Sequence, residues 1–449
     1  MRFTFRNQPL GRIASVIAVL AVSANATLDG NPLATPDQQT LDALAIKISQ
    51  DDNFTVLKAE AKAAYQTAHG LPISDEASSS IDAAIDELAF SSIQKAVNGD
   101  TYFPKVYWVD AGPRNWFGLD VPGGRYSYDN PDCIYRTIPI DSSLSYIITG
   151  YRHGSGPTDV TFSLISDPNS QNTVAYLSGS DLVVDSDGSY TITVNSSSGD
   201  NQTNHIQSTL LAKQLLIRNN LGNWATEKPD NLTVDLVDDN SSQSALTEAE
   251  IILAASWNLQ ESIVDYGVGA LGIKTSINKV NTLSAPSQSS TLGTLTTQAS
   301  SFGHFDLSDD EALVATVTQG DADYFVFPLT NPWIITTDPA SQVSLNNKQA
   351  VANENGTYTF VISVEDPGVY NWLNTTGLHE GTIMVRWQGL PTTSSSSTSS
   401  TTSPAVDIQV VPLSELASVL PSETRYVTVE ERESLLAQRL AAYAQRTEF

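Results

Sequence analysis

Cysteine and basic residues are scarce in this chain of 449 residues. The one cysteine, Cys133, has no second cysteine for an internal disulfide, so the fold must rest on its hydrophobic core. Only 23 lysine and arginine residues stand against 50 aspartate and glutamate residues, which gives a net charge of −27. Because such a surface repels phosphate backbones and anionic lipids, we expect no nucleic-acid partner and no binding to a membrane surface.

Apolar runs of the ~20 residues that cross a bilayer as a helix are also missing. One shorter run, from Ile13 to Val22, follows three arginines and precedes the small residues Ala24 and Ala26. This order is typical of a secretory signal peptide spanning residues 1–26. The sequence therefore predicts a secreted, extracellular protein.

Glycosylation motifs agree with export. Seven asparagines begin an N-x-S/T triplet without an intervening proline: Asn53, Asn195, Asn201, Asn231, Asn240, Asn355 and Asn374. We therefore predict a glycoprotein.

The distribution of residue types predicts a mainly β protein with flanking helices. Thr35 and Pro36 begin a helical pattern, and short runs rich in β-branched residues alternate with turn residues from about Tyr102 onward. The pairs Thr247/Glu250 and Thr428/Glu431 have the capping-box spacing that starts a helix. We expect the following segments: a helical region (27–100), a first β-sandwich domain (101–240), a helical connector (241–299), a second β-sandwich domain (300–391), a Ser/Thr linker (392–403) and a C-terminal tail with a helix (404–449).

The two β-rich segments look like copies of each other. VDSDGSYTITV (184–194) corresponds to ANENGTYTFVI (352–362), and NHIQSTLLAKQLLIR (204–218) corresponds to NWLNTTGLHEGTIMVR (371–386). The repeat is too long for a solenoid and occurs only twice. It predicts two related antiparallel β-sandwich, jelly-roll-like domains from internal duplication.

Several motifs resemble a known family. DEALVATV from Asp310, NPWIITTDPASQVSLNNKQAV from Asn331 and DPGVYNWLNTTGLHEGTIMVRW from Asp366 resemble the domain of unknown function 1214 family. NPDCIYRTIPID from Asn130 and NNLGNWATEKPD from Asn219 resemble its domain-1254-like upstream region, as in secreted fungal and actinobacterial members. The resemblance implies a β-sandwich architecture, and it implies neither an activity nor catalytic residues.

His379 is the one candidate catalytic residue. It stands beside Glu380 in a glycine-rich turn, and an imidazole near a carboxylate can act as a general base. Neighbouring residues usually point apart, however, so the alternative is a histidine that caps a turn. The remaining histidines and Cys133 show no metal-ligand spacing, and we expect no metal and no cofactor.

Two arginines, Arg218 and Arg386, end matched strands of the repeat. Their planar guanidinium groups can brace the sandwich through a buried carboxylate or hold a ligand. Tyr135 and Arg136, after a Pro-Asp turn, either begin a strand or reach the space between the domains.

A ligand-binding cleft between the domains is the functional prediction. Aromatic rings and amides suit a neutral, hydroxyl-rich ligand such as a carbohydrate or another small molecule, although the same tryptophans could equally fill the core. The alternative is a metal-independent hydrolase that uses His379 or a pair of carboxylates. The sequence does not indicate an oligomeric state. The residues expected at the cleft are Arg218, Arg386, Tyr135, Arg136, Trp372, Asn371, His205, Asn204 and Trp333.

Overall fold

The computed structural model describes residues 30–70, 73–199, 202–273, 279–289, 297–391 and 402–448. The predicted signal peptide, Asn201 and most of the predicted Ser/Thr linker lie outside these ranges. Among the described residues, no helix combines the length and apolar character that a membrane span requires.

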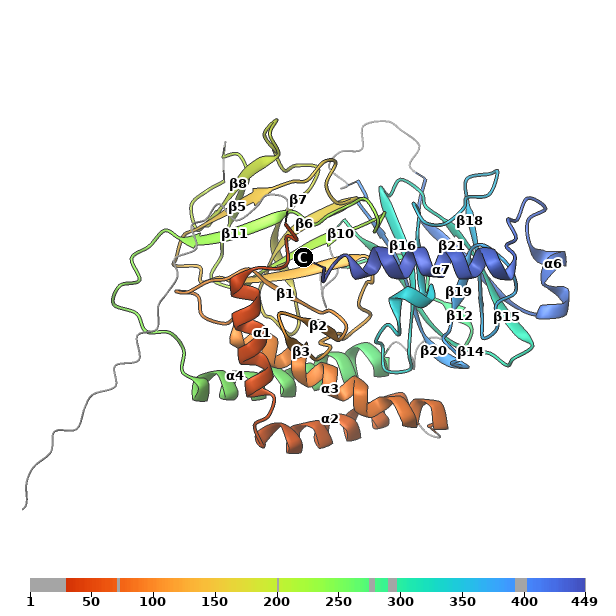
Figure 1. The fold of residues 1–449 in the computed structure, drawn as a ribbon, viewed down its shortest axis with the longest axis horizontal. Helices are drawn as coiled ribbons and strands as arrows, with labels where there is room; N and C mark the ends of the chain where they lie inside the picture. Colours follow the sequence, from red (N-terminus) through yellow and green to blue (C-terminus); the bar gives the residue numbers. More distant parts are fainter. Residues whose placement is uncertain are drawn as a thin grey trace, which may run out of the picture. The chain divides into compact units, whose positions relative to one another are not determined.

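Three helices begin the described chain: α1 (Pro36–Ile48), α2 (Asn53–His69) and α3 (Asp75–Val97). The Thr35 side chain caps α1 by accepting a hydrogen bond from the Gln38 amide, and Pro36 occupies the first turn as the sequence predicts. The Ser74 side chain caps α3 in the same way through the Ala77 amide. Helices α2 and α3 pack against α4 (Glu248–Ser262), which continues as a π-helix, η1 (Ile263–Ile273) (Figure 1).

Two sheets form the first β unit, which we define as residues 107–236. The larger sheet contains, in spatial order, β1 (Tyr107–Val109), β4 (Cys133–Pro139), β10 (Gln214–Asn220), β6 (Asp159–Ile165) and β7 (Thr173–Ser178). The smaller sheet contains β11 (Asn231–Leu236), β5 (Tyr146–Tyr151), β8 (Ser189–Asn195) and β9 (His205–Gln207). Apolar side chains of both sheets, such as Phe162 and Ile192, share one buried core. A separate hairpin joins β2 (Arg114–Trp116) to β3 (Leu119–Val121).

Two more sheets form the second β unit, which we define as residues 282–412. The larger sheet contains β12 (Thr282–Leu283), β14 (Ala299–Asp306), β20 (Glu380–Gln388), β16 (Tyr324–Thr330) and β17 (Ser344–Asn346), with β13 (Ser287–Gln288) also paired to β14. The smaller sheet contains β19 (Trp372–Asn374), β18 (Tyr358–Ser363), β15 (Glu311–Thr318) and β21 (Ala405–Pro412). Phe327, Phe360 and Trp387 lie in the core that both sheets share.

Strand order is the same in the two β units. The order β4-β10-β6-β7 corresponds to β14-β20-β16-β17, and β11-β5-β8-β9 corresponds to β21-β15-β18-β19. One pair in each unit, β8 with β9 and β18 with β19, is parallel. The expectation of purely antiparallel sheets is therefore wrong at these two places, because a crossing loop, and not a tight hairpin, precedes β9 and β19.

Segment boundaries also differ from the expected ones. Strand β21 lies in the expected C-terminal tail, yet it pairs along its whole length with β15 of the second β unit. Strands β12 and β13 lie in the expected helical connector, yet they pair with β14. Both differences arise because these short segments become strands through pairing with a strand elsewhere in the chain.

Helix α7 (Val429–Ala444) closes the chain, after η2 (Pro339–Ser341), η3 (Leu413–Glu415) and α6 (Leu416–Val419) earlier in the sequence. The predicted capping boxes are present at both α4 and α7. In α7, Leu440 is 58% exposed whereas Arg432 is only 5% exposed. The helix docks through arginines because the surface under it offers carboxylate and carbonyl oxygens.

Candidate functional site

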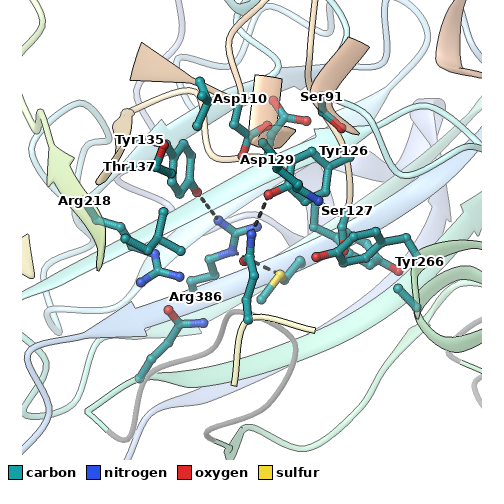
Figure 2. Close-up of a pocket in the computed structure, with 18 of the residues that line it drawn as sticks. Ser91, Asp110, Tyr126, Ser127, Asp129, Tyr135, Thr137, Arg218, Tyr266 and Arg386 are labelled. Carbon is teal, nitrogen blue, oxygen red and sulfur yellow. Dashed lines mark hydrogen bonds between the residues drawn. The ribbon is translucent and has the colours of Figure 1, made fainter. Parts of the chain in front are cut away.

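A polar cavity lies where the two large sheets meet α3 and η1 (Figure 2). The space open to the centres of water-sized molecules is about 70 Å³, several times the ~10–15 Å³ that one water molecule needs. Alternate residues along part of β4, β10 and β20 face it, as the alternation of side chains along a strand requires. The strand residues are Tyr135, Thr137, Gln214, Leu216, Arg218, Met384, Arg386 and Gln388.

Arg218 and Arg386 reach this cavity from the matched strands β10 and β20. Both are buried, with exposed fractions of 5% and 6%. Nη1 of Arg218 donates to Ser163 Oγ at 3.3 Å, and Nη1 of Arg386 donates to Tyr135 Oη at 3.4 Å. No ion pair of the described residues includes Arg386. The described polar contacts of Arg386 are with neutral groups, the Tyr135 hydroxyl and the Met384 sulfur, which lies 3.0 Å from its Nε atom. Its guanidinium is therefore able to bind an anionic ligand.

Asp110 supplies a carboxylate to the same cavity. Its backbone φ is 53°, in the left-handed region, and its Oδ1 atom is buried without a hydrogen-bond partner. Burial raises the pKa of Asp110 well above its usual value, and the negative charge of Asp129 raises it further, against the opposing effect of Arg386 and Lys95. A strained residue with an unsatisfied buried acceptor is typical of a ligand site.

Asp129 is the second carboxylate of the cavity, and it is better satisfied. It accepts hydrogen bonds from the amide of Thr336 at 2.8 Å and from the Thr336 hydroxyl. Burial raises its pKa, whereas the charge of Arg125 lowers it. Asp129 is therefore anchored to the second β unit, and Asp110 is the acid with free acceptor capacity.

Lys95 enters the cavity from α3. Its Nζ atom donates to Asn169 Oδ1 at 3.2 Å and to Ser262 Oγ at 3.4 Å, and it lies 4.5 Å from the centre of the Tyr126 ring. Burial lowers the pKa of Lys95 to about 8, although nearby carboxylates oppose the shift. Tyr266 completes this end of the cavity, with its ring centre 5.4 Å from the amine.

Amide side chains join the two large sheets at the cavity edge. Asn220 and Gln388 hold matched positions on β10 and β20, two residues after Arg218 and Arg386, and Asn220 Nδ2 donates to Gln388 Oε1 at 2.7 Å. Gln388 Nε2 in turn donates to Gln298 Oε1 at 2.8 Å. These contacts hold the two arginine-bearing strands in fixed relative positions.

Three of the residues expected at the cleft line this cavity: Tyr135, Arg218 and Arg386. Arg136, the neighbour of Tyr135, points to the opposite face of the strand and donates to the carbonyl of Asp230 and to Asn219 Oδ1. It braces the interior of the first β unit, because adjacent strand residues face opposite sides.

Asn204 and Asn371 have matched structural roles away from the cavity. Asn204 Oδ1 accepts from the Val183 amide at 2.8 Å and its Nδ2 donates to the Val183 carbonyl at 2.7 Å. Asn371 makes the same two contacts with Val351, both at 2.8 Å. Each asparagine fixes a crossing loop. Its side-chain amide is already bonded to the main chain, so the amide is not available to a ligand.

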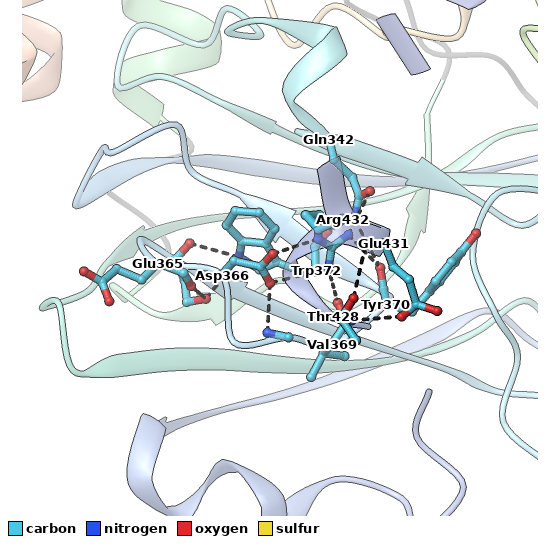
Figure 3. A network of polar contacts seen from close by, with 11 residues as sticks. Gln342, Glu365, Asp366, Val369, Tyr370, Trp372, Thr428, Glu431 and Arg432 are labelled. Carbon is cyan, nitrogen blue, oxygen red and sulfur yellow. Dashed lines mark hydrogen bonds and ion pairs between the residues drawn. The ribbon is translucent and has the colours of Figure 1, made fainter. Parts of the chain in front are cut away.

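The expected aromatic lining is also elsewhere. Trp372 donates from Nε1 to the Ser363 carbonyl at 3.2 Å and lies under Arg432 of α7, whose guanidinium is 5.2 Å from its ring centre (Figure 3). Trp333 is fully buried, and its Nε1 donates to the carbonyl of Ala77 in α3 at 2.9 Å. His205 contacts Asn195 Oδ1 at 3.0 Å within the first β unit. These side chains fill packing sites and do not line the cavity.

His379 lies outside the cavity, between two carboxylates. Its Nδ1 atom is 2.6 Å from Glu76 Oε1 and its Nε2 atom is 3.0 Å from Asp309 Oδ1. These hydrogen bonds raise the pKa of His379. Glu380 turns away toward His69, as expected for adjacent residues. With both ring nitrogens engaged, His379 joins α3 to the second β unit, and no described contact gives it a role as a general base.

Sequence patterns did not identify Lys95, Asp110, Tyr126 or Tyr266 as site residues, because these residues come from helices and loops outside the repeat. The sequence held one signal for Lys95, which is the one charged residue in the run Leu88–Val97. The structure shows that this whole run is buried. Within the described ranges, no group of three or more His, Cys, Asp or Glu residues could hold a metal ion.

Comparison with known proteins identifies a fold and no function. No family model and no curated protein matches the chain. A crystal structure of an uncharacterized protein from Burkholderia cenocepacia superposes with a TM-score of 0.67 at 19% identity, covering 82% of this chain and 99% of that chain. A protein from Vibrio parahaemolyticus gives a TM-score of 0.38 at 11% identity, covering 73% of this chain and 99% of its own. The Burkholderia protein shares the mainly β fold with helices, and the resemblance to the domain of unknown function 1214 family stays a prediction.

Proposed function

We propose that the two β units are β-sandwich domains that arose by internal duplication. The matched strand orders, the matched parallel pairs and the identical contacts of Asn204 and Asn371 support this proposal. Under it, Arg218 and Arg386 are the same residue in two copies, and both face one cavity.

We propose that the protein binds a small hydroxylated organic acid, such as a sugar acid, in this cavity. The observation that carries the proposal is the presence of Arg218 and Arg386 together with the unpartnered Oδ1 atom of Asp110. The guanidinium groups suit a carboxylate, because their planar donors match its two oxygens. Asp110 suits a ligand hydroxyl, which would satisfy its free acceptor.

The aromatic and amide residues of the cavity support the hydroxylated part of this ligand. Tyrosine rings offer faces for C–H groups and hydroxyls for hydrogen bonds, and glutamine amides offer both a donor and an acceptor. This ligand class keeps the hydroxyl-rich character that the sequence suggested. The proposed ligand differs from the neutral ligand expected from the sequence in carrying a negative charge, because two arginines line the cavity.

Substitution of Arg386 tests the proposal. Glucuronate should bind and glucose should bind far more weakly in isothermal titration calorimetry. Arg386→Gln should weaken glucuronate binding by about 10- to 100-fold, since a hydrogen bond to a charged group contributes roughly 1.5–3 kcal/mol. Arg425→Gln is the matched control, because Arg425 is an exposed arginine outside the cavity. Equal affinity of the native protein for glucose and glucuronate would contradict the proposal.

A second candidate function is hydrolysis by a pair of carboxylates. Asp110 and Asp129 both line the cavity, and burial raises the pKa of each. Carboxyl groups with raised pKa values can act as general acids at neutral pH. Release of free sugar acid from an aryl glucuronide would favour this function over binding alone.

We further propose that the protein is an exported glycoprotein. None of the six described sequon asparagines is buried, and Asn53 and Asn355 are exposed. Glycan attachment requires such accessibility. A drop in apparent mass after treatment with an N-glycosidase would support the proposal, and a first residue of Met1 in the purified protein would oppose it.

A further inference from the structure

Lys95 is a buried amine held by neutral groups. It is 8% exposed, and it donates hydrogen bonds to the amide oxygen of Asn169 and to the hydroxyl of Ser262. No ion pair of the described residues includes Lys95. The charged groups that influence it, Asp110, Asp167 and Asp265, act from a distance.

A lysine placed in this way is costly as a purely structural residue. Burying an ammonium group without a paired carboxylate loses hydration that neutral acceptors replace only in part. The pKa near 8 means that a substantial fraction of the amine is neutral at slightly alkaline pH. A neutral amine carries the free electron pair that attacks a carbonyl carbon.

The other residues that line the cavity indicate which carbonyl compound could bind next to this amine. Arg218 and Arg386 line the same cavity as Lys95, and Tyr126 and Tyr266 flank the amine. A ligand that satisfies both parts carries a carboxylate and an aldehyde or ketone. Sugar acids with a free aldehyde in their open-chain form have both groups, as do simple oxo acids.

We propose that Lys95 forms a reversible imine with the carbonyl carbon of a small oxo acid whose carboxylate is bound by Arg218 and Arg386. This proposal rests on the proposed binding function and names the reactive group of its ligand. A double bond forms between Nζ and the carbonyl carbon, and the double bond between that carbon and its oxygen breaks. The nitrogen gives up both protons of the neutral amine, the oxygen leaves as water, and no oxidant or reductant is needed.

Asp110 is placed to assist the loss of water. It lines the same cavity as Lys95, and its buried Oδ1 atom has no hydrogen-bond partner. Burial raises the pKa of Asp110, which favours its protonated form. A protonated carboxyl can donate its proton to the departing oxygen and recover one from the nitrogen. Asp110 is therefore the positioned acid of this step.

Reductive trapping tests the proposal on the full native chain. The protein is incubated with glyoxylate and sodium cyanoborohydride, and the adduct is located by mass spectrometry of the intact chain and of its peptides. We expect one adduct per chain, at Lys95, and at least a tenfold preference over acetaldehyde, which lacks the carboxylate. Modification spread over exposed lysines such as Lys47 and Lys213, with none at Lys95, would overturn the proposal.

Two variants separate this proposal from the proposed binding function. Lys95→Met should abolish the adduct, whereas Lys213→Met, which removes an exposed lysine, should leave it unchanged. Because the location of the adduct in the native protein is decisive by itself, a folding defect in Lys95→Met does not remove the test. If glucuronate and glyoxylate bind in calorimetry and no adduct forms at Lys95, the imine fails and the binding function stands. If Lys95 reacts equally with glyoxylate and acetaldehyde, the role of the arginines fails.

Discussion

His379 illustrates how a residue that sequence patterns mark as catalytic can instead be part of a contact between elements. Its imidazole links Glu76 of α3 to Asp309, before β15. Both partners are carboxylates, so the charged form of the imidazole is favoured. The consequence is a contact whose strength depends on pH.

Substitution of His379 should therefore change the pH dependence of stability. The folded-state pKa of His379 lies above the unfolded value of about 6.5, so its contribution is fully present below that pH and is lost as pH rises through the folded pKa. We expect His379→Gln to lower the free energy of unfolding by roughly 0.5 kcal/mol near pH 5.5 and by nearly nothing near pH 8.5, because the site is partly exposed.

Urea denaturation at the two pH values measures this difference. His205→Gln is a control of opposite sign, since burial lowers the pKa of His205 and its contribution is lost as pH falls. A loss at His379 that is equal at both pH values would show that the ion pairs do not form in solution.

At the residue scale, the sequence predicted the strand-borne part of the site and missed the rest. Arg218 and Arg386 were recognisable because a repeat places them at equivalent strand ends. Trp372 and Asn371 were misassigned because an amide or indole reads the same in the sequence whether its partner is a ligand or the main chain. Lys95 and Asp110 were missed because nothing local indicates that α3 and the loop after β1 meet the same cavity.

Helix α7 shows the same contrast at the scale of elements. Its start at Thr428 and its capping box are local features, and the sequence predicted them. Its docking is not local. Arg432 pairs with Asp366 and donates to Gln342 Oε1 at 3.1 Å (Figure 3). Arg439 lies over the ring of Trp224 in the first β unit at 4.0 Å. The helix thus contacts both β units.

Removal of the Arg432 side chain should loosen this helix. Arg432→Ala leaves the carbonyl of Val369 and the carboxylate of Asp366 without their charged donor, so we expect a loss of about 2–3 kcal/mol in the free energy of unfolding. Hydrogen exchange should speed up along α7 in the same variant. Gln438→Ala, on the exposed side of α7, is the control and should change little. An unchanged exchange rate in Arg432→Ala would mean that contacts other than those of Arg432 hold the helix.

The order of strands within each sheet could not be predicted from the sequence, for a related reason. Turn residues and apolar alternation identify a strand, and they do not identify its neighbour. Strand β21 could be assigned to a sheet only through its pairing with β15, which lies on the other side of the Ser/Thr segment. Two-residue strands such as β12 carry too little pattern to be recognised at all.

At the scale of the whole molecule, residues Asn31–Phe449 form one compact unit. Asp132 is a main reason. Its Oδ1 atom accepts from Trp224 Nε1 at 2.8 Å, and its Oδ2 atom accepts from Tyr324 Oη at 2.6 Å and Asn346 Nδ2 at 2.7 Å. The last two donors belong to the second β unit, so one buried carboxylate joins the two units.

Loss of Asp132 should therefore affect both β units together. Asp132→Ala leaves three buried donors unsatisfied, and we expect it to lower the free energy of unfolding by roughly 3 kcal/mol or more. Tryptophan fluorescence and far-ultraviolet circular dichroism should follow one common transition in the native protein and two separated transitions in the variant. Asp120→Ala, at an exposed carboxylate, is the control. A native protein that already unfolds in two steps would show that the units are independent domains.

The place of β21 in the chain has a consequence for biosynthesis. Strand β15 is made well before β21, and a ribosome adds ~5–20 residues per second, so β15 waits for seconds with one edge unpaired. An unpaired edge is the surface on which nascent chains recruit strands from one another. A premature stop codon in the Ser/Thr segment would make that interval permanent, and the truncated product would be prone to aggregate although every residue of the cavity had already been synthesised.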